Sequence, residues 1–325
     1  MVSPASAHAE TPYYGKSYEQ PASVKKSYTL SLTRRLIPLP FRKKEKHLRP
    51  KKSFKLSYET LSAKSPYATQ RQIGTSIEGR SIPALYFTKD RSITPLSKKK
   101  PTIWLQAQIH GNEPASGESA LVIAKRLAGE EGERILNHVN IIIVPRINPD
   151  GSYAFDRRLA NGLDGNRDHM TLESPELAAL HQEFNRYAPE VVIDAHEYDV
   201  GQKQFENIGS SGALKYHDLL ILSGKNLNIP ESIRLTSNEL YINGVRETLT
   251  NKGFSNDLYY TNTNTRGKDG KIDIYEGGTD ARIGRNALAL SSALSFLVES
   301  RGIGIGREDF ARRVAAQVAT HEKNH

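Results

Sequence analysis

Short apolar runs that alternate with helix-patterned segments constrain the fold of this chain more than any other feature. Residues 102–109, 139–144 and 191–195 have the pattern of buried strands, whereas residues 119–128 and 175–187 have helical spacing. Strands that alternate with helices are typical of a largely parallel sheet with helices on both faces. The sequence therefore predicts an α/β domain in which loops at the carboxyl ends of the strands carry the functional side chains.

Further elements are expected on either side of this alternation. Residues 70–87 read as a hairpin, residues 287–298 as a helix followed by a buried strand, and residues 310–320 as an amphipathic helix. Residues 197–286 are polar and rich in Gly, Asn and Thr. We therefore expect long loops that build a site in that stretch.

The positive charge of the chain is concentrated near its beginning. The formal net charge is +9, and residues 25–55 contain twelve Lys or Arg against one acid, Glu45, so the remainder is close to neutral. A nucleic-acid enzyme would carry its cations within the folded domain, so we expect no nucleic-acid partner. We predict a solvated basic extension over residues 1–56, with contact to an acidic surface as the alternative, and a domain over residues 57–325.

The beginning of the chain also bears on location. Ala7-His8-Ala9 matches the pattern of a signal-peptidase site, although the apolar stretch that should precede it is missing. This predicts the remnant of an export signal and a periplasmic or secreted protein, or a cytoplasmic one if the pattern arose by chance. No apolar run reaches the roughly eighteen residues of a membrane span, so we expect no transmembrane segment. The oligomeric state stays open.

Histidine and carboxylate side chains follow two of the predicted strands. His110 and Glu113 come directly after the first strand of the alternation, and His196 comes directly after the third. The chain has no cysteine, so a metal must be held by His, Asp or Glu. Two His and one carboxylate leave a zinc position open for water, as in catalytic sites, and Asp194 could be an outer partner. For each histidine alone, an ordinary hydrogen-bonded residue is the alternative.

Five sequence blocks resemble the zinc carboxypeptidase family, which includes the pancreatic carboxypeptidases and bacterial murein-peptide amidases. In chain order they are His110-x-x-Glu113, Asn148-x-x-Gly151, Gly162-x-Asp164-x-Asn166-Arg167, Asp194-x-His196 and a late apolar strand with Glu299. The resemblance implies a three-layer α/β/α fold with a mixed, largely parallel sheet of about eight strands. It also implies one zinc ion held by His110, Glu113 and His196, and hydrolysis of the last bond of a peptide with a free C-terminal carboxylate.

The resemblance implies roles for two further residues near the metal. Glu299 matches the glutamate that takes a proton from the attacking water and passes it to the leaving amine, with a salt bridge to Arg301 as the alternative. Arg157 matches the arginine that stabilises the developing oxyanion, and the adjacent Arg158 is left open.

Other matches concern the substrate. Asn166 and Arg167 match the pair that binds the terminal carboxylate. Tyr275 resembles the tyrosine that closes over the substrate, and Tyr198 matches a position near the preceding subsite. The specificity pocket does not transfer from the family.

Two departures and several alternatives accompany this interpretation. Asp168 and His169 stand where the family usually has Asn and an aromatic residue. Asp280 or Glu276 would line the specificity pocket if the enzyme prefers basic terminal residues. The alternatives are a murein-peptide amidase of the same family, a deacylase of the succinylglutamate desuccinylase or aspartoacylase kind, and a binding module without catalysis.

Overall fold

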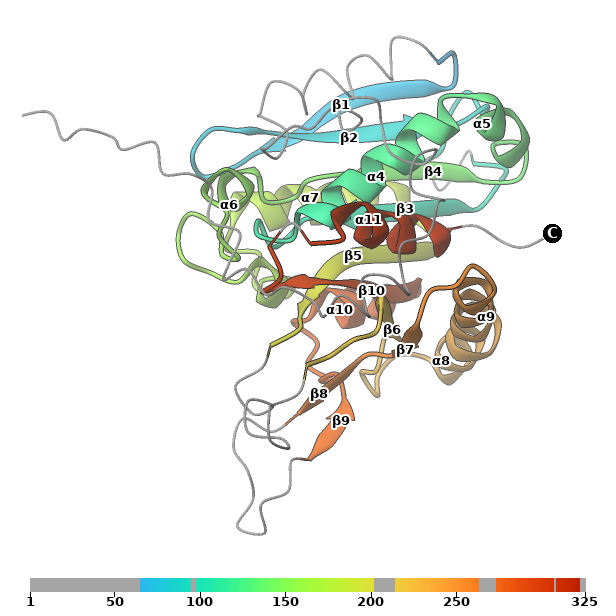
Figure 1. Ribbon diagram of the computed structural model, residues 1–325. Helices are drawn as coiled ribbons and strands as arrows, with labels where there is room; N and C mark the ends of the chain where they lie inside the picture. Colours follow the sequence, from blue (N-terminus) through green and yellow to red (C-terminus); the bar gives the residue numbers. More distant parts are fainter. Residues whose placement is uncertain (1–64, 95–97, 202–213, 263–272, 307, 322–325) are drawn as a thin grey trace, which may run out of the picture.

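The described part of the chain forms three layers, a central sheet with helices on both faces (Figure 1). It comes from a computed structural model, which describes residues 65–94, 98–201, 214–262, 273–306 and 308–321. The predicted basic extension over residues 1–56, with its export pattern, lies outside the described residues.

The central sheet has eight strands in the order β1-β2-β4-β3-β5-β10-β6-β7. Their bounds are Ala68–Thr75 (β1), Ser81–Phe87 (β2), Thr102–Ala107 (β3), Asn140–Val144 (β4), Val191–Asp199 (β5), Leu219–Ser223 (β6), Asn256–Leu258 (β7) and Leu294–Ile303 (β10). β4, β3, β5 and β10 are parallel in the middle of the sheet, whereas β1, β2 and β4 pair antiparallel at one edge and β6 is antiparallel to β10. The prediction of a mixed, largely parallel sheet is confirmed.

Helices cover the two faces of the sheet in two groups. Their bounds are Pro114–Leu127 (α4), Glu130–Ile135 (α5), Pro149–Ala154 (α6), Pro175–Tyr187 (α7), Glu231–Thr236 (α8), Asn243–Asn251 (α9), Gly284–Leu290 (α10) and Phe310–Ala319 (α11). Residues of α4, α9 and α11 share one apolar cluster with the sheet, and residues of α7 and α10 share another. No helix of the described residues is long and apolar enough to cross a membrane.

Alternation along the strands supplies both clusters. In β3, Leu105 packs into the cluster under α4, whereas its neighbour Trp104 packs into the cluster under α7. Successive side chains of a strand point to opposite faces, so a central strand covered on both sides must be apolar throughout. This explains why the central strands read as continuous apolar runs in the sequence.

The residues at the start of α7 explain why the predicted and observed bounds of this helix agree. Ser174 accepts a hydrogen bond from the backbone N of Leu177, and Pro175 occupies the first turn, where its missing N–H costs little. The predicted helix over residues 119–128 is instead the second half of α4, which begins at Pro114. The first turn, Pro114–Gly117, is buried, and the helix then packs on α11, where Ser119 Oγ donates to Gln317 Oε1 at 3.0 Å.

The expectation of long loops over residues 197–286 is wrong for much of that stretch. The structure places β6, α8, α9 and β7 there, together with a π-helical segment, Ser237–Ile242, between the two helices. A separate two-stranded sheet pairs β8 (Tyr260–Asn262) with β9 (Ile274–Glu276). β6 is completely buried, but its apolar run has only four residues before Ser223. A run this short was not recognisable as a strand within a polar stretch of sequence.

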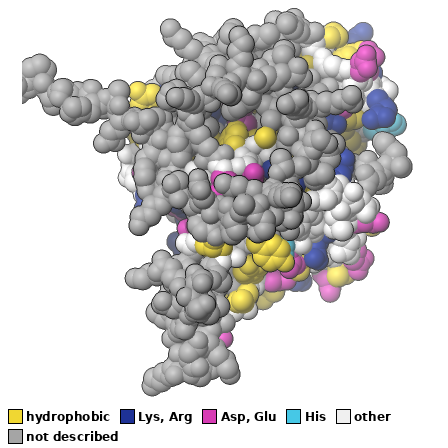
Figure 2. All heavy atoms as spheres, viewed as in Figure 1, with side chains coloured by type: hydrophobic (Ala, Val, Ile, Leu, Met, Phe, Trp, Pro, Cys, Tyr) yellow, Lys and Arg dark blue, Asp and Glu magenta, His cyan; other side chains and the backbone are white. Residues whose placement is uncertain are grey.

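Charged side chains of both signs are interspersed over the described surface in Figure 2. This agrees with a near-neutral body that lacks the cation-rich extension.

The loop after β3 packs directly on the backbone of α6. A Cβ atom at residue 111 would lie 1.9 Å from the carbonyl carbon of Gly151 and 2.2 Å from the backbone N of Ser152. Because backbone atoms cannot move aside cheaply, we expect Gly111→Ala to lower the free energy of unfolding by about 3 kcal/mol. Urea unfolding measures this change.

The control for this prediction is Gly244→Ala. Gly244 lies in α9 with no atom within 4 Å of an added Cβ, so alanine should stabilise the helix by about 1 kcal/mol. Equal effects of the two substitutions would contradict the close approach of the loop after β3 to α6.

Candidate active site

Strand order brings the predicted metal ligands together. His110 follows β3, Glu113 immediately precedes α4, and His196 lies near the carboxyl end of β5. β3 and β5 are neighbouring parallel strands, so their carboxyl ends meet at one edge of the sheet. β10 is the next strand, and its Glu299 pairs in register with His196.

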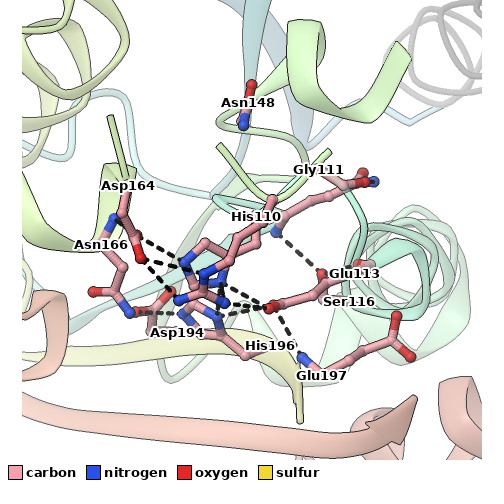
Figure 3. A network of polar contacts seen from close by, with 12 residues as sticks. His110, Gly111, Glu113, Ser116, Asn148, Asp164, Asn166, Asp194, His196 and Glu197 are labelled. Carbon is pink, nitrogen blue, oxygen red and sulfur yellow. Dashed lines mark hydrogen bonds and ion pairs between the residues drawn. The ribbon is translucent and has the colours of Figure 1, made fainter. Parts of the chain in front are cut away.

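The three side chains converge on one point, as Figure 3 shows. One ligand atom from each of His110, Glu113 and His196 lies within 4.8 Å of the other two. The two Oε atoms of Glu113 lie 2.7 Å from His110 Nδ1 and 2.9 Å from His196 Nδ1, and all three residues are buried. Two imidazoles and a carboxylate that share one point fit the donor set of a catalytic zinc site.

A carboxylate faces the other ring nitrogen of each histidine (Figure 3). Asp194 Oδ2 lies 3.1 Å from His196 Nε2, and Asp164 Oδ1 lies 3.0 Å from His110 Nε2. Such outer carboxylates fix the tautomer and orientation of a ligating imidazole. Asp164 was not singled out as a site residue from the sequence, although it lies inside the Gly162–Arg167 block.

Charges within the cluster decide its protonation. Burial by itself raises the pKa of Glu113, but the adjacent His110 and His196 outweigh it and hold this pKa below its usual range. Burial lowers the pKa of His196, yet Asp194 and Glu113 raise it well above its usual value. A metal ion at this site would therefore compete with a proton on His196.

Arg157 lies beside the predicted metal ligands. Its Nη1 is 3.2 Å from His110 Nδ1, and its Nη2 donates to Asp164 Oδ2 at 2.9 Å. The neighbouring Arg158 instead donates to the carbonyl oxygen of Gly162 at 2.7 Å and is exposed. This geometry favours Arg157 over Arg158 as the group that meets the reacting oxygen.

Glu299 is a buried carboxylate within β10, directly after the apolar residues Phe296–Val298, with an exposed fraction of 9%. Burial raises its pKa, and the negative charge of Glu113 raises it further against the opposing effects of His196, His110 and Arg157. A carboxylate in these surroundings is poised to accept a proton.

A cavity of about 260 Å³ joins these groups. Its lining includes the predicted residues His110, Glu113, Arg157, Asn166, Arg167, Tyr198 and Glu299. It also includes Tyr259, Lys215 and Arg285, which sequence reasoning missed. None of the three belongs to a recognisable motif, and the polar sequence around them gave no indication that they line a cavity.

Tyr275 stands apart from this lining. It lies on β9 with an exposed fraction of 51% and is not among the described residues that line the cavity. Its closure over a substrate stays a prediction.

The two acids considered for specificity are also outside the cavity lining of the described residues. Glu276 is exposed and lies 2.8 Å from Lys225 Nζ, and Asp280 is exposed and lies 3.5 Å from Arg282 Nε. Their carboxylates therefore face partner cations on the surface. The structure gives no support to a basic-residue pocket built from them.

Asp168 and His169, the departures from the family pattern, have local roles in the fold. Asp168 accepts hydrogen bonds from the backbone N atoms of Glu173 and Ser174, and so shapes the turn before α7. His169 Nδ1 lies 2.9 Å from His181 Nε2, and burial lowers the pKa of His169 to about 3.

Comparison with known proteins agrees with this site. Residues 57–191 match the zinc carboxypeptidase family. Carboxypeptidase 2 of Trichophyton equinum is 38% identical over 242 residues, which cover 73% of this chain and 44% of that protein. Probable carboxypeptidase 2 of Trichophyton verrucosum is 37% identical over 242 residues, which cover 73% of this chain and 46% of that protein. The chain thus spans less than half the length of these curated relatives.

Solved structures share the fold. A metallo-carboxypeptidase from Burkholderia cenocepacia superposes with a TM-score of 0.61 at 18% identity, over 84% of this chain and 68% of that one. The metallo-carboxypeptidase of Pseudomonas aeruginosa superposes with a TM-score of 0.61 at 19% identity, over 84% of this chain and 67% of that one. The family match and the fungal relatives identify a zinc carboxypeptidase domain in this chain, and the solved structures share its fold.

Proposed function

We propose that this chain hydrolyses the last peptide bond of peptides that end in a free carboxylate, with one zinc ion held by His110, Glu113 and His196. The observation that carries the proposal is the convergence of these residues within 4.8 Å, beside a cavity that His110, Glu113, Glu299 and Arg157 line. The fungal relatives that are named carboxypeptidases support a peptide as the substrate.

The groups of the chain divide the work around the scissile bond. A zinc ion in this donor set supplies Lewis acidity towards water and a carbonyl oxygen. Glu299 takes a proton from the attacking water and returns it to the leaving amine. Arg157 donates hydrogen bonds to the oxygen that gains negative charge, since its Nη1 lies beside the ligand His110.

Asn166 and Arg167 bind the terminal carboxylate in this proposal. Oδ1 of Asn166 accepts from the backbone N of Gly284 at 2.7 Å, so donation to a substrate falls to its amide nitrogen. Arg167 is exposed, and its Nη1 donates to the carbonyl oxygen of Asn166 at 2.8 Å. A planar guanidinium held in this way can form two parallel bonds to a carboxylate.

Removal of the Arg167 guanidinium tests the proposed function. Because a charge-assisted pair is lost, Arg167→Ala should raise KM for free-carboxylate peptides about a hundredfold, whereas amidated peptides should change little. Steady-state kinetics on matched free and amidated peptides measures the difference. Arg186→Ala, which removes an exposed arginine on α7, is the control. An equal loss on both kinds of peptide would reject exopeptidase action.

The alternatives within the family predict other preferred substrates. A murein-peptide amidase would prefer cell-wall peptides, and a deacylase of the succinylglutamate desuccinylase or aspartoacylase kind would prefer N-acyl amino acids. A panel of the three substrate classes distinguishes them with the same preparation of protein. A periplasmic or secreted location, and a domain boundary near residue 57, remain part of the proposal on sequence grounds.

A further inference from the structure

Arg285 is a buried cation in the wall of the catalytic cavity. It occupies the first turn of α10, lines the cavity with Arg167 and Glu299, and has an exposed fraction of 4%. No step of the proposed reaction uses it.

Arg285 differs from the other buried arginines because no carboxylate among the described residues pairs with it. Three arginines are buried in the described part of the chain. Arg312 Nε lies 2.6 Å from Asp218 Oδ1, and Arg313 Nε lies 2.8 Å from Glu197 Oε1. Arg285 Nη2 donates only to the carbonyl oxygen of Gly278, and its buried Nε has no hydrogen-bond partner among the described residues. Burying an unpaired charge is costly, so the guanidinium is suited to an anion that arrives from outside.

The backbone leaves room for this guanidinium. A Cβ at residue 277 would lie 2.8 Å from Arg285 Nη2 and 3.0 Å from the ring of Tyr259. Glycine at this position therefore lets both side chains approach the same part of the cavity. Burial lowers the pKa of Arg285, as expected for a cation without an acidic neighbour in contact.

The position of Arg285 relates it to the residue that is cleaved off. The backbone N of the neighbouring Gly284 donates a hydrogen bond to Oδ1 of Asn166, one of the pair proposed to bind the terminal carboxylate. Arg167 of that pair is exposed, whereas Arg285 is buried. The α-carboxylate of the terminal residue thus has its own partners, of which Arg167 is accessible. The more deeply buried guanidinium of Arg285 remains free to bind the side chain of that terminal residue.

We propose that Arg285 binds an acidic side chain of the terminal residue, so that the enzyme prefers peptides that end in glutamate or aspartate. This inference rests on the proposed carboxypeptidase function. It differs from the option of a basic preference through Asp280 or Glu276, because these two carboxylates pair with surface cations and a cation lines the cavity wall.

Lys215 is the other cation in the cavity lining to which the proposed reaction gives no role. Its Nζ lies 4.6 Å from the ring centroid of Tyr260 and 5.8 Å from that of Tyr198, the position matched to the preceding subsite. We therefore expect it to contact the part of the substrate before the scissile bond. It offers a control in which a cation is removed from the same cavity.

The test compares two peptides that differ only in a terminal Glu or Gln, which have the same shape and differ in charge. Wild-type protein loaded with zinc should cleave the Glu peptide with a kcat/KM about ten- to a hundredfold higher. Arg285→Gln should bring this ratio close to one, mainly through loss on the Glu peptide. Lys215→Gln and the surface variant Arg282→Gln should keep the ratio within about threefold of wild type.

Each outcome decides the inference. Equal cleavage of both peptides by wild type, or an equal loss on both in Arg285→Gln, would overturn it while the carboxypeptidase function stands. If wild type cleaves no peptide of any terminal residue, the proposed function fails and this inference with it. Should Arg285→Gln not fold, inhibition of wild type decides: free glutamate must inhibit more strongly than free glutamine, and equal inhibition rejects the acidic preference.

Discussion

Replacing Glu299 with Gln should lower kcat by about a thousandfold or more while zinc remains bound. The amide has the shape of the carboxylate but cannot accept a proton, so general-base catalysis is lost and the ligands His110, Glu113 and His196 stay in place. Peptide hydrolysis and metal content, measured on the same preparation, test both halves of this expectation. Glu239→Gln, the same chemical change at an exposed residue, should leave both unchanged.

The same residue predicts an acidic limit to activity. Burial and the charge of Glu113 raise the pKa of Glu299 above its ordinary value of 4.5. A base acts only when ionised, so activity should be present above this raised pKa and lost as the pH falls through it. The residual activity of Glu299→Gln should lack that limb. Full activity in this variant, or an unchanged acidic limb, would remove Glu299 as the base.

The residues that could be predicted from sequence share one physical property. Each lies at or beside the end of a strand whose apolar run is recognisable, so that the parallel order of β3, β5 and β10 brings distant residues together. His110, His196 and Glu299 could therefore be expected to meet before any coordinates were known. Here local sequence and sheet topology point to the same place.

The residues that sequence reasoning missed depend on tertiary packing. Tyr259 follows the short strand β7, and Arg285 lies in the first turn of α10. Both fall in the stretch that was predicted to form loops. Nothing in their local pattern distinguishes a cavity wall from a surface, because the distinction depends on which elements cover them. Asp164 is different, since its place between Gly162 and Arg167 marks it as part of a block. It could have been identified as a partner of a nearby histidine.

Replacing His196 with Ala should abolish zinc binding and peptide hydrolysis together. Only two of the proposed zinc ligands would remain, and the carboxylates of Glu113 and Asp194 would each lose a buried partner. In the metal-free protein His196 lies 2.9 Å from Glu113 Oε2 and 3.1 Å from Asp194 Oδ2. Loss of one partner from such a buried pair costs about 3–5 kcal/mol of stability. Metal content, hydrolysis and urea unfolding measure these effects, with His138→Ala, a change at an exposed histidine, as the control.

The raised pKa of His196 gives this prediction a second signature. A folded-state pKa above the unfolded value means that the contribution of His196 to metal-free stability is fully present below the unfolded pKa. That contribution is lost as the pH rises through the folded pKa. Zinc must displace the proton, so binding near neutral pH should release about one proton from wild type and none from His196→Ala. Zinc should also raise the melting temperature of wild type alone. If zinc stabilises the variant as strongly as wild type, His196 is not a ligand and the metal lies elsewhere.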